Sequence, residues 1–112
     1  MQVSKNNLGE VTVVKISGKI IGAPDVADIN KIFSDLSGEG KIRVVVDLAE
    51  MEMISSSGLG ALIASMTSMK KKGGNLKFAN VSDNILHVLK ITRLDTVFEI
   101  FDSVDKALKS FQ

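Results

Sequence analysis

Apolar residues along the chain follow two spacings, one typical of β-strands and one typical of α-helices. The stretch 11–17 is rich in β-branched residues and predicts a strand that pairs with an earlier strand through a turn at 6–9. The stretch 41–47 is almost continuously apolar, as is typical of a central parallel strand covered by helices. The sequence predicts strands at 2–6, 11–17, 41–47, 75–80 and 97–101.

Between these strands, apolar residues recur every three or four positions and predict four helices. Pro24 suits the start of the first helix, where its missing N–H has no partner to lose. The second helix starts at the serine-rich segment 55–60 and ends before Gly73 and Gly74, and Ser82 and Ser103 are good N-caps for the last two. The expected apolar faces contain Val26, Ile29, Phe33 and Leu36 in the first helix, and Leu59, Leu62, Ile63, Met66 and Met69 in the second.

The resulting order, ββαβαβαβα, predicts a layered α/β domain. We expect a mixed sheet of four to five strands packed with about four helices. A chain of 112 residues without linkers or repeats fits a single domain over 1–112.

Composition and charge remove several functional classes. The chain has 14 Lys and Arg against 13 Asp and Glu, so it lacks the concentrated positive charge that nucleic-acid binding needs. It has no Cys and one His, which excludes thiolate sites and argues against a zinc site. No signal-peptide pattern and no apolar run of about 20 residues is present. We therefore expect a cytoplasmic protein with no metal, no cofactor and no membrane or nucleic-acid partner.

The segment Ser-Ser-Ser-Gly-Leu-Gly at 55–60 is the most informative part of the sequence. One serine is explained by N-capping of the helix that follows. Capping needs only one hydroxyl, so two more are left without a structural role. The functional alternative is a phosphate-accepting serine or a backbone anion site at the helix start, and the residues themselves leave both interpretations open.

A serine-based enzyme is not predicted. In a hydrolase elbow, G-x-S-x-G, the first glycine would fall at Ser55, and the only histidine is His87, on the predicted third helix. A phosphate-binding P-loop would need a lysine where Leu59 and Ala61 stand.

Two further features have structural and functional interpretations. The run of three lysines at 70–72 is expected to lie at the solvated end of the second helix. A membrane or nucleic-acid site made of three lysines is not expected. Methionines usually fill the core, but Met51 and Met53 lie in the loop expected directly before the serine segment. The alternative to core filling is that these two side chains form an adaptable contact surface.

Several of these motifs occur together in one known family. Val44–Leu48, six intervening residues and Ser55–Gly60 resemble the signature of the STAS family, an apolar strand ending in Asp-Leu, a short loop and then Asp-Ser-Ser-Gly-Leu-Gly. The likeness covers nearly the whole chain, with matching stretches at 14–18, 89–94, 98–101 and 105–108.

The resemblance implies an anti-sigma-factor antagonist that works by partner switching. Such a protein binds an anti-sigma factor that is a serine kinase of the GHKL type, and it is released when that kinase phosphorylates the serine before the glycine. A PP2C-type phosphatase resets the system. The serine in question is Ser57, with Ser56 as the runner-up. The expected partner-binding residues are Met51, Met53, Ser55, Ser56, Ser57, Gly58 and Leu59.

The sequence departs from the family pattern at two places. Ser55 stands where the signature has Asp, and Ile21 stands near the position of an acidic residue that often follows the turn at Gly18. Both departures bear on phosphorylation of Ser57 and neither bears on the fold. The alternative function is a STAS accessory module that binds a small ligand or a lipid-transport partner without phosphorylation.

Overall fold

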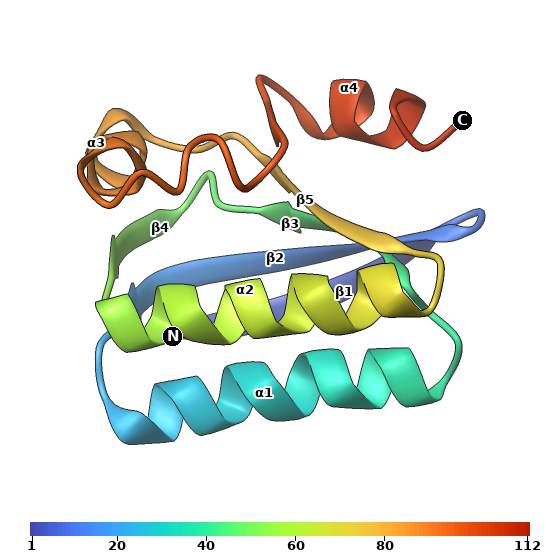
Figure 1. Cartoon of the computed structure of the whole chain (residues 1–112), viewed down its shortest axis with the longest axis horizontal. Coiled ribbons are helices and arrows are strands. Elements are labelled where there is room, and N and C mark those ends of the chain that lie inside the picture. The colour runs from blue at the N-terminus through green and yellow to red at the C-terminus, as the bar shows by residue number, and fades with distance from the viewer.

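The computed structural model describes residues 1–112 and shows one sheet between helices (Figure 1). The strands are β1 (Gln2–Leu8), β2 (Val11–Ile20), β3 (Arg43–Asp47), β4 (Met51–Ile54), β5 (Asn75–Ala79) and β6 (Ile100–Phe101). The helices are α1 (Ala23–Gly38), α2 (Ser56–Lys71), α3 (Asp83–Ile91) and α4 (Val104–Lys109). The predicted mixed α/β architecture with four helices is confirmed, but the sheet has six strands rather than four or five.

The sheet is built around β2, its longest strand. β1 pairs with β2 in the antiparallel sense, and β2, β3, β5 and β6 follow as parallel neighbours. The first half of β2 pairs with β3, and its last residues pair with β4. Because β2 reaches past the end of β3, it provides a free edge on which β4 forms.

β4 is the element that the sequence pattern missed. Met51–Ile54 was expected in a loop, yet it runs parallel to the end of β2, with Gly18 opposite Met51 and Ile20 opposite Ile54. Four residues are too short for a recognisable alternation, and the strand exists because a distant segment supplies its hydrogen-bonding partner. The placement of Met51 and Met53 in a loop was therefore wrong.

The last strand is shorter than predicted. Only Ile100 and Phe101 pair with β5, whereas the apolar pattern indicated a strand from 97. Phe98 is buried instead by side-chain packing, since its ring stacks on Phe78 with 4.3 Å between centroids. Within 97–101, the apolar character of Phe98 thus reflects core packing, and only that of Ile100 and Phe101 reflects strand pairing.

The two faces of the sheet are covered unequally. α1 and α2 lie side by side over one face (Figure 1) and enclose the main core of 21 buried residues, which include Ile85 and Leu89 of α3. α4 covers the other face over a cluster of five buried residues. The alternation of β3 shows the division, because Val44 and Val46 belong to the main core and Val45 to the small one. This arrangement fixes the start of α2 at the end of β4, where the serine segment lies.

Candidate functional site

Ser55 is the N-cap of α2. It has extended backbone angles, φ −80° and ψ 165°, and its Oγ accepts a hydrogen bond from the Gly58 N–H at 3.1 Å. Its own N–H donates to the Ile20 carbonyl at 2.8 Å, which ties the start of the helix to β2. The capping role predicted for one of the three serines therefore belongs to Ser55.

Ser56 and Ser57 are the first two residues of α2 and both are exposed. Neither hydroxyl forms a hydrogen bond within the protein. The first turn of α2 contains no acidic residue, and the N–H groups of a first helical turn lack intrahelical acceptors. The two hydroxyls are thus free to react, at a place where an added negative charge is favoured.

Gly58 holds this turn against the sheet. A Cβ at this residue would lie 2.7 Å from Ile20 Cγ2 and 3.0 Å from Ile54 Cγ1. A side chain at position 58 would therefore push α2 away from the ends of β2 and β4. The glycine is explained by close packing, which holds the start of α2, with the exposed Ser57, against the ends of β2 and β4.

The seven residues expected to contact a partner divide into two groups. Met51, Gly58 and Leu59 are buried in the structure, and Met51 and Leu59 pack in the main core. Met53 is 49% exposed, Ser56 and Ser57 are exposed, and Ser55 is half-buried at its cap. The surface that a partner can reach is thus made by the second group, and the first group supports it from beneath.

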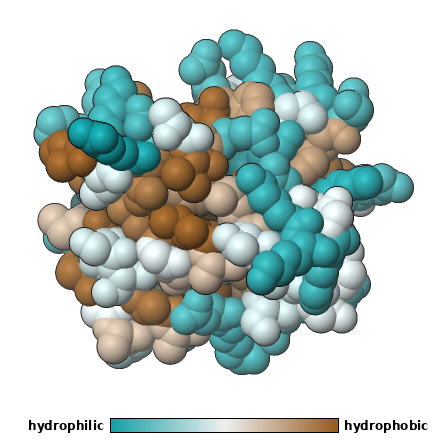
Figure 2. Space-filling model, in the orientation of Figure 1, coloured by the Kyte–Doolittle hydropathy of each residue, from teal (hydrophilic) through white to brown (hydrophobic).

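Ile21 joins this surface, although the sequence pattern had not assigned it to the site. It follows directly on β2, as Met53 lies on the neighbouring β4, and 54% of it is exposed. Figure 2 shows that hydrophobic residues gather on the side of the molecule where α3, β4 and the start of α2 lie, whereas the other side is mainly hydrophilic or neutral. Successive side chains of a strand point to opposite faces, so two adjacent isoleucines at its end cannot both enter the core. Ile20 is buried, and Ile21 is exposed.

The one histidine of the chain lies on a different helix from the three serines. His87 is exposed on α3. No group of three or more His, Asp or Glu side chains is placed to hold a metal ion. What the site offers is two free hydroxyls at the start of α2 and exposed apolar side chains at the ends of the two strands, β2 and β4, against which this helix start packs.

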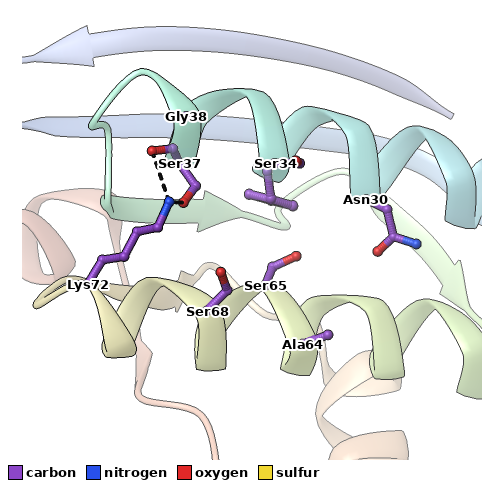
Figure 3. A pocket seen from close by; sticks show the side chains of 9 residues that line it. Asn30, Ser34, Ser37, Gly38, Ala64, Ser65, Ser68 and Lys72 are labelled. Carbon is purple, nitrogen blue, oxygen red and sulfur yellow. Dashed lines mark hydrogen bonds between the residues drawn. The ribbon is translucent and has the colours of Figure 1, made fainter.

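A separate groove lies between α1 and α2 (Figure 3). It has a volume of about 460 Å³ and is lined by Asn30, Phe33, Ser34, Ser37, Gly38, Ala64, Ser65, Ser68 and Lys72. Lys72 Nζ donates to Ser37 Oγ at 2.6 Å, so the one charged group of the groove joins the ends of the two helices. Because ligand pockets are mostly apolar and this lining is mostly polar, the groove does not favour a small-ligand function.

Comparison with known proteins finds one family model and several relatives that match this chain. The STAS domain family model matches residues 2–107. A Thermotoga neapolitana protein, provisionally named an anti-sigma factor antagonist, is 27% identical over 81 residues, or 72% of each chain. The anti-sigma-B factor antagonist of Bacillus subtilis is 32% identical over 53 residues, 47% of this chain and 49% of the relative.

Solved structures share the fold at low sequence identity. An anti-sigma factor antagonist from Mycobacterium paratuberculosis superposes with a TM-score of 0.85 at 22% identity, covering 97% of this chain and 92% of that one. The unphosphorylated antagonist SpoIIAA gives 0.75 at 15% identity, covering 97% and 96%. None of the four helices is long and apolar enough to cross a membrane. The match of the family model to nearly the whole chain shows that this protein belongs to the STAS domain family.

Proposed function

We propose that this protein is an anti-sigma factor antagonist that binds a kinase-type anti-sigma factor through the start of α2 and is released when Ser57 is phosphorylated. One observation carries the proposal: Ser55 alone fills the cap, which leaves the exposed Ser56 and Ser57 with free hydroxyls. The names of relatives such as the anti-sigma-B factor antagonist support the same role. The anti-sigma factor is a serine kinase of the GHKL type, and a PP2C-type phosphatase restores the unmodified form.

Ser57 is the proposed phosphate acceptor. It directly precedes Gly58, as in the family signature, and is the second residue of α2. A phosphate there lies beside the unpaired N–H groups of the first turn, which form a favourable anion environment. Ser56 is the runner-up, because it is also exposed and lies in the same turn.

The switch acts on binding rather than on folding. A phosphoserine adds a charge of about −1.5 to −2 at neutral pH. At a helix start this charge is favoured by about 0.3–1 kcal/mol, so the modified protein stays folded. Burying the same charge without a partner in an interface costs about 3 kcal/mol or more, which corresponds to about a hundredfold loss of affinity. The interface penalty is the larger of the two free energies.

The replacement of the usual Asp by Ser55 is compatible with this role. The Ser55 hydroxyl caps α2 by accepting from the Gly58 N–H, as a carboxylate oxygen at this position would. The substitution therefore keeps the helix start in place while removing a negative charge. A phosphate on Ser57 then has no acidic neighbour in the first turn to repel it.

The decisive experiment is phosphorylation by the GHKL-type kinase encoded nearest to the gene, followed by peptide mapping by mass spectrometry. We expect the wild-type protein and the matched control Ser56→Ala to take up one phosphate, and Ser57→Ala to take up none. Equal incorporation in wild type and Ser57→Ala would show that the site is elsewhere. If the wild-type protein binds the kinase and takes up no phosphate, this protein is not switched by phosphorylation.

A further inference from the structure

The two glycines near the start of α2 have different surroundings. Gly58 is buried, and a Cβ there would collide with Ile20. Gly60 is exposed, and a Cβ there would meet nothing within 4 Å. Its φ is also not positive, so an ordinary residue could adopt the same backbone conformation. The fold therefore explains Gly58 and does not explain Gly60.

Gly60 makes α2 less stable than an alanine at the same position would. It is the fifth residue of the 16-residue helix α2, well inside the first turns. A glycine inside a helix is less favourable than an alanine by about 1 kcal/mol, because it loses more backbone freedom on folding. The one structural benefit of a missing side chain at an exposed position is that another molecule can approach the main chain closely.

The surroundings of Gly60 indicate what kind of molecule that is. Gly60 lies about one helical turn after Ser56 and Ser57, and all three are exposed on α2. No charged residue occurs in α2 before Lys70, although the strands that lead to the helix expose charged Glu52 and Lys19 as well as apolar Met53 and Ile21. The exposed side of α2 around Gly60 thus suits an uncharged segment of a protein partner better than a charged one.

We propose that Gly60 is a contact residue for the anti-sigma factor, which places an uncharged segment in van der Waals contact with the α2 main chain at this point. The inference rests on the proposed function and extends its site by a residue that the sequence had not assigned to it. It also supplies the geometry of the switch. A segment held against Gly60 lies about one turn from the Ser57 hydroxyl, so a phosphate on Ser57 meets the same segment.

The test is Gly60→Ala, with Gly38→Ala as the matched control. Gly38 lies in α1, is exposed, lacks a positive φ and has nothing within 4 Å of its Cβ position. Because alanine favours the helix in both variants, we expect each to keep or raise the Tm, by up to a few degrees. In calorimetric titration with the GHKL-type kinase, Gly60→Ala should bind about tenfold or more weakly, since even one methyl group must be accommodated in a packed contact. Gly38→Ala should bind like wild type.

Each outcome decides a different question. Equal affinity of Gly60→Ala and wild type would overturn the contact at Gly60 while leaving the proposed function intact. A lowered Tm for Gly60→Ala would show that the fold itself needs this glycine, which would overturn the inference as well. A folded wild-type protein that does not bind the kinase would overturn the proposed function and, with it, the contact.

Discussion

α1 and α2 are the same length, lie side by side over the same face of the sheet and differ in what they show to solvent. The exposed side of α1 carries Asp28, Lys31 and Asp35, and the last two form an ion pair at 3.0 Å. The exposed side of α2 before Lys70 carries only Ser56, Ser57, Gly60, Ala64, Thr67 and Ser68.

This difference shows that the buried side and the exposed side of a helix meet separate requirements. Both helices bury an apolar face in the same core, so both satisfy the demand of folding. Charged side chains on α1 are typical of a surface that remains in water. The small, uncharged residues at the start of α2 suit the proposed partner contact, whereas Ala64 and Ser68 line the groove beside α1.

The largest effects are expected where the two helices are alike. Phe33 in α1 and Leu62 in α2 are both almost fully buried in the main core. Phe33→Ala and Leu62→Ala should each lower the free energy of unfolding by about 2–5 kcal/mol, through lost burial and the cavity left behind. Urea denaturation monitored by circular dichroism measures both. A loss below about 1 kcal/mol for only one of them would show that the helices are not equally anchored.

The next effect concerns the close approach of α2 to the sheet. Gly58→Ala places a methyl group 2.7 Å from Ile20 Cγ2 and should destabilise the fold by about 1–3 kcal/mol. The double variant Gly58→Ala with Ile20→Ala, which removes Cγ2, should lose less stability than the sum of the two single variants, since neighbouring substitutions are not additive. Denaturation curves with no change for Gly58→Ala would contradict the packing role of this glycine.

The helix starts provide a smaller contrast. Ser55 caps α2 through its side chain, so Ser55→Ala should lower the free energy of unfolding by about 0.5–2 kcal/mol. Ser55→Asp restores an oxygen acceptor and should keep most of the stability. Chemical denaturation of both variants is the measurement, and equal losses for alanine and aspartate would show that the cap contributes little.

The smallest effect is expected at the corresponding position of α1. Its N-cap is Gly22, which has no side-chain hydrogen bond and sits at φ −104° and ψ 172°. Serine is compatible with these angles, and the nearest atom to its Cβ, Pro24 Cδ, would be at an ordinary 3.5 Å. Gly22→Ser should therefore raise the free energy of unfolding by about a few tenths of a kcal/mol. A loss of stability in denaturation experiments would show that the start of α1 needs glycine.

Much of this protein was determined by local sequence alone. The order of the helices and most strands follows from the apolar spacing, which needs no knowledge of distant residues. The caps at Ser82 and Ser103 are confirmed, since each side chain accepts a hydrogen bond from the N–H three residues later. Caps and amphipathic faces are predictable because their physical causes lie within one or two turns of the chain.

Tertiary structure alone decided the features that depend on distant partners. β4 exists because β2 extends past β3 and offers it an edge, and this strand turns Met51 inward and Met53 outward. The sequence contains two glycines in one motif, and only the positions of Ile20 and Ile54 show that Gly58 is packed while Gly60 is open. Strand pairing and close packing join residues far apart along the chain, so a local pattern determines which elements form, and their mutual contacts determine which side chains remain available to a partner.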